Sequence, residues 1–412
     1  MLTRVLVPAV LALLALTAPA AAHAAAYVPG EVIVKYRDSG GSKLRATRPG
    51  TTVRKTVTRL RADPDVAYAV PNYIARASAW LPNDPGFRLQ WNLAGPVSIN
   101  MPEAWEIARN RGVPGAKGTV VAVLDTGVAY RTTKKRFRRA PDLRRFKRGY
   151  DFVDNDRKPF DLNGHGTHVA GTVAQTTNNR KGAAGVAYRA KIMPLRVLDS
   201  EGAGDTVAIS RAIRYATRKR VDVINLSLEF DSSVRASQIP DIVRALRKAR
   251  RRGILVVGAA GNQADSVVAY PARAPGVLAV AATTDSGCEA DYSNAGVDVD
   301  VSAPGGGANT PNDDNPWDAR ACSQGQGRDI FQQTFTRGLK RFGLPDGYEG
   351  TSMSAPHVSG VAALLIATKR LGHKPSPRAI EEHLERTSRD IGPPGFDPRY
   401  GYGLIDAAAA LR

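Results

Sequence analysis

The stretch VAVLDTG at residues 121–127 decides the fold class of this chain. Four apolar residues run directly into Asp125, Thr126 and Gly127. A short apolar run with no polar alternation is typical of a strand that is buried on both faces of a parallel sheet. Ligand sites of such sheets lie at the carboxyl ends of the strands. The pattern therefore predicts that Asp125 stands at a functional edge of the sheet.

The same pattern recurs along the chain from about residue 83 onward. Short apolar runs rich in Val and Ile lie at residues 119–124, 191–197, 221–226, 254–259 and 277–281. Helical patterns lie between them at residues 206–218 and 239–251. Strands that alternate with helices are typical of βαβ units. The sequence therefore predicts an α/β fold with a mostly parallel central sheet.

The composition bounds the class of protein. The 412 residues include 58 Lys and Arg, 38 Asp and Glu, and 43% hydrophobic residues, with a net charge of +20. This hydrophobic content is enough for a sizeable core and excludes a disordered protein. Two cysteines exclude a scaffold built on disulfides and a zinc module held by four thiolates.

The N-terminus has the pattern of a secretory signal peptide over residues 1–24. A basic start at residues 1–4 precedes an uncharged apolar run at residues 5–18 and an Ala-x-Ala site at residues 22–24. A membrane anchor is the alternative, but the run is shorter than the ~20 residues that a span needs. The pattern therefore predicts a secreted, extracellular protein.

Cys288 and Cys322 are the two cysteines of the chain. Outside the cell they can form a disulfide, because the surroundings are oxidising. Two free thiols remain the alternative, because a sequence does not show the geometry that a disulfide needs.

Residues 25–78 have the pattern of a small separate unit. Alternating apolar and polar residues predict strands at residues 31–36 and 65–70, and a short helix is expected at residues 57–61. A unit of this size is marginal for independent folding. We therefore expect it to dock on the rest of the chain, residues 79–412, which form the large domain.

Three short segments of the large domain carry an Asp, a His and a Ser among small residues. Asp125 ends an apolar run, His165 lies in NGHGTHVAG at residues 163–171, and Ser352 lies in GTSMSAPHVSG at residues 350–360. Each alone has an ordinary structural explanation, such as a helix cap. Together they supply a hydroxyl nucleophile, a base that takes its proton and a carboxylate that orients the base.

Asn262 follows the apolar run at residues 254–259 and Gly261. Its amide NH2 can donate a hydrogen bond to the oxyanion of a tetrahedral intermediate. The alternative is a turn Asn with a left-handed backbone.

The three motifs, in the order Asp, His, Ser, resemble those of the subtilisin-like serine proteases, or subtilases. The resemblance covers residues 83–412 and implies the three-layer subtilisin-like fold and a serine endopeptidase. The roles that it implies are Ser352 as the nucleophile, His165 as the general base, Asp125 as the orienting residue and Asn262 as the oxyanion donor.

Residues 27–76 resemble the propeptide of this family, through VPGEVIV at residues 28–34 and DPDVAY at residues 63–68. A propeptide of this kind is an intramolecular inhibitor and a folding chaperone. The resemblance therefore implies activation by removal of the propeptide, with cleavage near residues 76–80.

The resemblance also implies substrate-binding segments. Leu226 and Ser227 belong to the strand that lines the S1 pocket. Gly202 and Gly204 belong to a loop that pairs with the substrate as an added β-strand. Many relatives carry Gly where this chain has Glu229. We therefore hypothesise that Glu229 narrows or acidifies the entrance of S1 and favours a basic residue before the scissile bond (P1).

A structural calcium site is implied by segments similar to those that build one in the family. Its ligands would be the hard oxygens of Asp84, Asp142 and Asn179. The cationic neighbours Arg180 and Lys181 would weaken the binding. No catalytic cofactor is implied.

Two features depart from the compact members of the family. Residues 305–349 form a longer insert, which we expect to be a surface excursion near the nucleophile. Basic residues are dense at residues 134–148 and 244–252. Such residues attract polyanions, namely cell wall, nucleic acid or an acidic substrate, but a solvated face is the favoured alternative. The sequence has no recognisable nucleic-acid-binding module, so no specific nucleic acid is expected.

The sequence as a whole predicts a secreted, propeptide-activated serine endopeptidase that acts on proteins and peptides. Likeness to the family makes a monomer the expectation. Two other classes stay open: a catalytically silent binding module on the same fold, and a polyanion-binding protein that only shares the fold. Since no member of the triad is missing, the enzyme is favoured.

Overall fold

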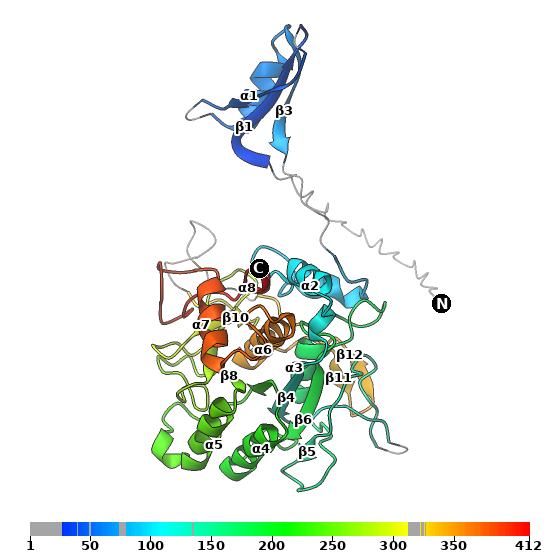
Figure 1. Cartoon of the computed structure of the whole chain (residues 1–412), viewed down its shortest axis with the longest axis vertical. Helices are drawn as coiled ribbons and strands as arrows, with labels where there is room; N and C mark the ends of the chain where they lie inside the picture. The colour runs from blue at the N-terminus through cyan, green and yellow to red at the C-terminus, as the bar shows by residue number, and fades with distance from the viewer. Residues whose placement is uncertain are drawn as a thin grey trace, which may run out of the picture. The chain divides into compact units, whose positions relative to one another are not determined.

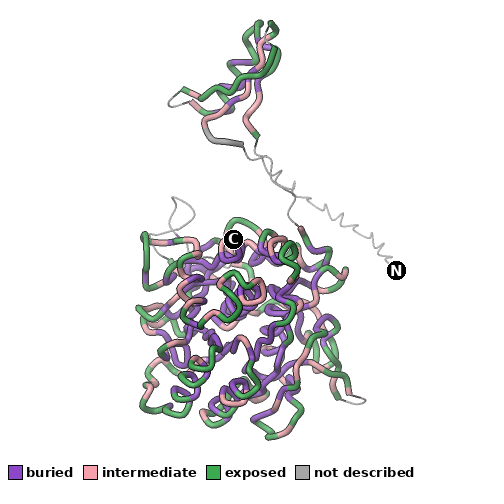
Figure 2. Tube along the Cα trace, in the orientation of Figure 1, coloured by how far each residue is buried: buried purple, intermediate pink, exposed green. Residues whose placement is uncertain are grey.

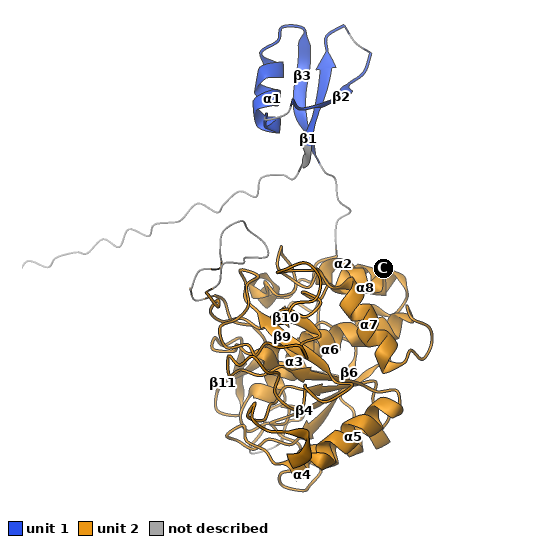
Figure 3. Cartoon of the chain, turned by 90° about the vertical axis from the view of Figure 1, so that its left-hand side faces the viewer, with its two compact units in different colours: residues 1–78 blue, residues 79–412 orange. Residues whose placement is uncertain are grey.

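The computed structural model describes residues 27–38, 40–48, 51–73, 80–133, 136–311, 322, 325 and 327–412. The chain divides into two compact units, Met1–Ser78 and Ala79–Arg412, which Figure 3 shows in different colours. The predicted signal peptide, residues 1–24, lies outside the described residues, as do residues 74–79 around the expected cleavage site.

The smaller unit is a three-stranded antiparallel sheet with one helix. Its elements are β1 (Tyr27–Tyr36), β2 (Lys43–Ala46), α1 (Val53–Arg61) and β3 (Val66–Tyr73), with the strand order β2-β1-β3. Val32 and Val34 of β1 are fully buried in a core that includes Leu60 of α1. The helix begins earlier than predicted, because the Thr52 side chain caps it by accepting a hydrogen bond from the backbone N–H of Lys55.

The larger unit is built on a seven-stranded sheet in the order β10-β9-β8-β7-β4-β6-β5 (Figure 1). Its strands are β4 (Val120–Asp125), β5 (Tyr150–Asp151), β6 (Lys191–Arg196), β7 (Val223–Leu226), β8 (Leu255–Ala259), β9 (Leu278–Thr283) and β10 (Val301–Pro304). All neighbouring strands in it run parallel. This confirms the predicted α/β fold, and each of the apolar runs overlaps a strand.

Helices cover both faces of this sheet and make a three-layer structure. They are α2 (Met101–Asn110), α3 (His165–Ala174), α4 (Thr206–Arg218), α5 (Pro240–Arg251), α6 (Thr351–Thr368), α7 (Pro377–Thr387) and α8 (Ala407–Leu411), with single 3-10 turns at Pro85–Leu89, Pro114–Ala116 and Ala236–Gln238. None of the helices in the described part of the chain is long and apolar enough to cross a membrane.

Both faces of the central strand β4 are buried, which explains its uninterrupted apolar sequence. Val121 and Val123 belong to a core cluster that includes residues of α3 and α6. Ala122 and Leu124 belong to a second cluster with residues of α4 and α5. Figure 2 shows that buried residues run through the interior of this unit. A strand enclosed in this way has no solvent face on which polar residues would alternate.

The carboxyl ends of three neighbouring strands bring the candidate residues to one edge of the sheet. Leu124 of β4 pairs with Leu226 of β7, which in turn pairs with Gly258 of β8. The helix α6 packs against β7 and β8. The residues that follow these strands therefore lie beside one another at this edge.

The insert at residues 305–349 is only partly a surface excursion. Residues 312–321, which include Asp313 and Asp314, lie outside the described residues. The later part forms a hairpin of β11 (Thr334–Arg337) and β12 (Arg341–Gly343). Ile330 and Thr334 are fully buried, so the expectation is wrong there. These residues are buried because the insert contacts the start of α3, where the Thr334 hydroxyl donates to the carbonyl oxygen of Gly164 at 2.5 Å.

The structure also contains a disulfide between Cys288 and Cys322.

Candidate active site

Asp125 and His165 are in direct contact at the carboxyl edge of the sheet. Asp125 is the last residue of β4 and is fully buried, and His165 is the first residue of α3. The distance between His165 Nδ1 and Asp125 Oδ1 is 2.7 Å. The same carboxylate oxygen accepts a hydrogen bond from the backbone N–H of Thr126 at 2.7 Å. With Asp125 ionised, Nδ1–H is the donor, so Nε2 carries the free lone pair of the neutral imidazole.

The surroundings of His165 favour its protonated form. Burial lowers the pKa of the imidazole, but the charge of Asp125 and the hydrogen bond to it outweigh burial, and the charge of Asp161 adds to them. The net effect raises the pKa of His165 above its ordinary value. An imidazole in this setting is suited to take a proton and hold it as imidazolium.

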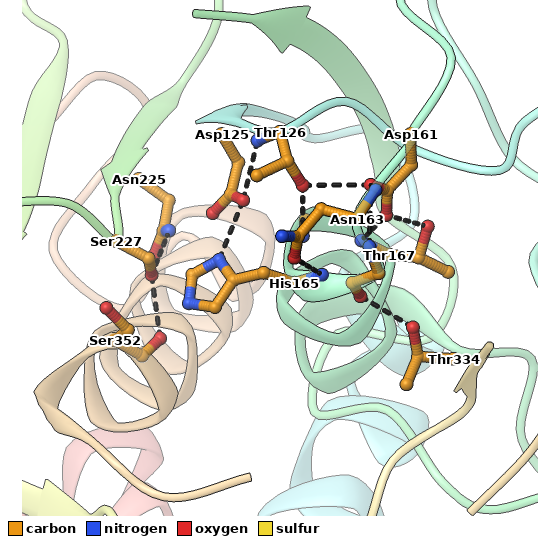
Figure 4. A network of polar contacts seen from close by, with 12 residues as sticks. Asp125, Thr126, Asp161, Asn163, His165, Thr167, Asn225, Ser227, Thr334 and Ser352 are labelled. Carbon is orange, nitrogen blue, oxygen red and sulfur yellow. Dashed lines mark hydrogen bonds and ion pairs between the residues drawn. The ribbon is translucent and has the colours of Figure 1, made fainter. Parts of the chain in front are cut away.

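Ser352 lies on the other side of the imidazole ring, as Figure 4 shows. It is the second residue of α6, which begins after Gly350. The Ser352 hydroxyl forms no hydrogen bond with any described residue, so its oxygen is available for reaction. The backbone carbonyl of Ser352 accepts a hydrogen bond from the Ser227 hydroxyl at 2.7 Å, which fixes the start of the helix against the end of β7.

His165 and Ser352 line one pocket of about 570 Å³. Its lining includes most of the residues that the sequence assigned to substrate binding, namely Gly202, Gly204, Ser227 and Glu229, together with Asn262. Leu226 is the exception. Its side chain is fully buried in the core cluster of α4 and α5, because alternate residues of β7 face opposite layers. Leu228 takes its place in the lining.

The amide of Asn262 is held with its NH2 group toward this pocket. Its Oδ1 accepts hydrogen bonds from the Thr351 backbone N–H at 2.8 Å and from the Thr351 hydroxyl at 2.9 Å. Its Nδ2 donates to Glu229 Oε2 at 3.2 Å. Gly261, with φ of 122°, takes the positive φ of this turn, and Asn262 does not. The alternative of a left-handed turn Asn is therefore wrong.

Asp161 is a buried residue of the site that the sequence interpretation missed. Its Oδ1 accepts hydrogen bonds from the Thr126 hydroxyl at 2.9 Å and from the backbone N–H groups of Asn163 and Gly164. Its Oδ2 accepts from the backbone and the hydroxyl of Thr167. Burial raises its pKa. The sequence signal was a carboxylate two residues before the glycine-rich segment of His165, but its partner Thr126 is distant in sequence.

A second network of hydrogen bonds connects β7 to α6. Asn225 Nδ2 donates to the Ser227 hydroxyl at 2.9 Å, and the Ser359 hydroxyl donates to Asn225 Oδ1 at 2.8 Å. All three residues are fully or almost fully buried. The only sequence signal was a polar Asn in an otherwise apolar strand. This hydrogen-bond network sets the position of α6 and hence of Ser352.

The other two histidines near the motifs are structural. His168 stacks on Tyr348 with ring centroids 4.2 Å apart, and burial lowers its pKa to about 3. His357 contacts Asn92 through Nε2 at 2.6 Å and the carbonyl of Met353 through Nδ1, and burial lowers its pKa to about 4. Both are neutral at physiological pH, and neither is among the residues that line the pocket.

The three predicted calcium ligands come together away from this pocket. Asn179 Nδ2 donates to Asp142 Oδ1 at 2.6 Å, and the backbone N–H of Asn179 donates to Asp84 Oδ1 at 2.9 Å. The side-chain oxygens of Asn179 and Gln175 are buried with no hydrogen-bond partner in the described structure. Burial, opposed by hydrogen bonds and aided by Asp84, raises the pKa of Asp142. Two carboxylates beside two unpartnered amide oxygens fit a hard divalent cation.

No described cluster holds three or more Asp, Glu, His or Cys side chains as ligands, so amide oxygens would have to complete such a site.

The chain is similar to known peptidases. The model of the subtilase family matches residues 116–403. Over 410 residues the chain is 35% identical to the thermophilic serine proteinase of Bacillus sp. (strain AK1), covering 94% of this chain and 88% of that protein. It is 34% identical to thermitase of Thermoactinomyces vulgaris, covering 81% and 100%. A solved structure of the proteases from Pseudoalteromonas arctica matches with a TM-score of 0.63 at 34% identity, covering 80% of this chain and 98% of that one.

Proposed function

This chain belongs to the subtilase family and is a serine endopeptidase, and from that premise we propose that Ser352, His165 and Asp125 carry out its reaction. The observation that carries the proposal is the 2.7 Å contact between His165 Nδ1 and Asp125 Oδ1, with Ser352 in the same pocket as the imidazole. A catalytically silent module has no need for an oriented imidazole beside an unbonded hydroxyl.

The reaction proceeds through an acyl-enzyme. Ser352 Oγ attacks the carbonyl carbon of the scissile bond while His165 Nε2 takes its proton, and a C–O bond forms. The carbonyl oxygen becomes an oxyanion, to which Asn262 Nδ2 donates a hydrogen bond. The C–N bond then breaks and the imidazolium gives its proton to the leaving amine. Water attacks the acyl-enzyme by the same route, which releases the acid and restores Ser352, while Asp125 holds the Nδ1–H of His165.

The test is casein hydrolysis by the mature wild-type enzyme and by Ser352→Ala. We expect the variant to lose activity by several orders of magnitude, and phenylmethylsulfonyl fluoride to inactivate only the wild type. Equal hydrolysis by both proteins would contradict the assignment of Ser352. A wild type that binds heparin and hydrolyses no peptide would instead support the polyanion-binding class.

We further propose that residues 1–24 are removed on export and that residues 25–78 act as an inhibitory propeptide. The support is the resemblance of this segment to subtilase propeptides and its own small core around Val32 and Val34. Added in trans, the isolated segment should slow casein hydrolysis by the mature enzyme. N-terminal sequencing of secreted protein should place the mature start near residues 76–80.

We also propose a structural Ca²⁺ ion held by Asp84, Asp142 and Asn179, with the orphaned oxygen of Gln175 beside them. The ion would neutralise two carboxylates that the fold brings together. The residues of this cluster fix the loop around Asn179 against the segment of Asp84, so the proposed role is stabilisation and not chemistry.

Binding of polyanions is a further proposal, and it rests on four exposed cations. Arg136, Arg337, Lys340 and Arg341 line a shallow pocket at the β11–β12 hairpin, and none of them makes an ion pair with a described residue. Replacing all four by Ala should lower the salt concentration that elutes the protein from heparin. A matched removal of four exposed cations on and beside α5, Arg247, Lys248, Arg251 and Arg252, should have a smaller effect.

We also propose that the mature protein is a monomer, and gel filtration should give the mass of a single chain.

A further inference from the structure

The candidate substrate pocket is acidic, although the protein is strongly basic. The chain has a net charge of +20, yet the pocket lining contains Glu201, Glu229 and Asp231 and, among the described residues, no Lys or Arg. Charges that line a cleft focus its field and raise the local concentration of ions of the opposite sign. The pocket is therefore suited to a cationic group of the substrate.

Glu229 is the least exposed of these three carboxylates. It makes no ion pair with any described residue, and its hydrogen-bond donor is Asn262, at 3.2 Å. Burial raises its pKa, although the contact with Asn262 opposes this. A half-buried carboxylate without a cationic partner is costly, and a cation brought by the substrate would relieve that cost.

The partner of Glu229 is the atom that is proposed to stabilise the oxyanion. Thr351 holds the amide oxygen of Asn262, so the NH2 group faces the pocket on the side of Glu229. In the free enzyme this donor lies beside a negative charge, which repels the negative charge that develops on the carbonyl oxygen during attack. The tetrahedral intermediate is disfavoured until the charge of Glu229 is neutralised.

We propose that Glu229 forms a subsite for the Lys or Arg side chain at P1, and that filling this subsite neutralises the charge beside Asn262 and speeds the chemical step. The inference rests on the proposed function of Ser352. Leu228 and Phe230 belong to the same pocket lining and can pack against the apolar stem of such a side chain. Recognition of the cation and stabilisation of the oxyanion are then coupled.

The experiment compares two peptides that differ only at P1, where one has Arg and the other citrulline, which keeps the shape without the charge. For the wild type we expect a kcat/KM that is on the order of 10- to 100-fold higher for the Arg peptide. Glu229→Gln keeps the size of the side chain and an oxygen that can accept the hydrogen bond from Asn262, but it removes the charge. It should bring the ratio close to one and should raise kcat for the citrulline peptide. Asp298→Asn, which removes an exposed carboxylate outside the pocket, should change neither value.

The Asn262→Ala background tests the coupling itself. There, Glu229→Gln should no longer raise kcat for the citrulline peptide. Equal kcat/KM for the two peptides in the wild type, or an unchanged ratio in Glu229→Gln, would overturn the subsite.

The two proposals fail in distinguishable ways. Casein hydrolysis that depends on Ser352 but shows no preference for Arg would leave the peptidase function intact and remove the subsite. Without any hydrolysis the proposed function fails, and calorimetric binding of the two peptides to Ser352→Ala protein still decides whether Glu229 selects the cation. Equal affinities would then overturn the subsite.

Discussion

The hydroxyl of Thr126 donates a hydrogen bond to Oδ1 of Asp161 at 2.9 Å. Thr126 directly follows Asp125, and the buried Asp161 also accepts from the backbone N–H of Gly164, next to His165. One carboxylate therefore joins the two segments that carry the carboxylate and the imidazole of the site (Figure 4). We infer that Thr126 and Asp161 act as positioning residues.

Thr126→Val keeps the shape of the side chain but removes this link, together with the hydrogen bond that the Thr126 hydroxyl accepts from the backbone N–H of Gly166 at 3.0 Å. We expect kcat to fall about tenfold with little change in KM, because a hydrogen bond to a buried charged group contributes on the order of 1.5–3 kcal/mol and its loss loosens the imidazole. Steady-state kinetics on one peptide substrate measure this. Thr368→Val, which removes a hydroxyl hydrogen bond near the far end of α6, is the control. An equal loss in both variants would argue against a positioning role.

The activity should depend on the protonation of His165. The neutral imidazole is the active form, and Asp125 raises the pKa of His165 above 6.5, so kcat/KM should rise with pH through a midpoint above 6.5. Asp125→Asn should move this midpoint to lower pH and lower kcat by about 10⁴-fold, because the amide no longer holds the imidazole in the correct tautomer. The pH profile of kcat/KM is the measurement. A midpoint that stays in place in Asp125→Asn would contradict the role of the carboxylate.

Removal of Ca²⁺ should destabilise the larger unit. An ion at 100 times its Kd adds about 2.7 kcal/mol to the free energy of unfolding, so a chelator should lower the thermal midpoint by several degrees. Ser352→Ala protein prevents self-digestion during the scan. Asp142→Asn should lower the midpoint and abolish the response to the chelator. A midpoint that the chelator leaves unchanged would show that no ion is bound at the tested concentration.

Glu289 should make the protein less stable as the pH rises from about 4.5 to about 7. Burial raises the pKa of Glu289 to about 7, although the charge of Arg399 opposes this and that of Asp397 adds to it. In this window the folded state binds more protons than the unfolded chain, so the free energy of unfolding falls with rising pH. The loss from this group is at most about 3 kcal/mol. Glu289→Gln should flatten this pH dependence, as measured by urea unfolding of Ser352→Ala protein at several pH values. An identical pH dependence in both proteins would contradict the assignment.

Several local features could be predicted from the sequence because they depend on neighbouring residues alone. The apolar run before Asp125 indicated a strand buried on both faces, and the alternation of such runs with helical patterns indicated a parallel sheet. The helix of the smaller unit was predicted too short, because its cap, Thr52, was not recognised. The insert near Thr334 was expected at the surface, because nothing in its own sequence shows that Gly164 would accept its hydroxyl.

The sequence by itself determined the α/β class, the strands of the sheet, and the presence and order of an Asp, a His and a Ser at element ends, because each follows from local pattern. Only the tertiary structure decided the partners of these residues. Asp161 reaches Thr126 because α3, which Asp161 precedes, packs against β4. Glu229 reaches Asn262 because the neighbouring parallel strands β7 and β8 end at the same edge of the sheet. Such contacts join residues that are far apart in the chain, and the charge and hydrogen-bond partners of the site depend on that folding.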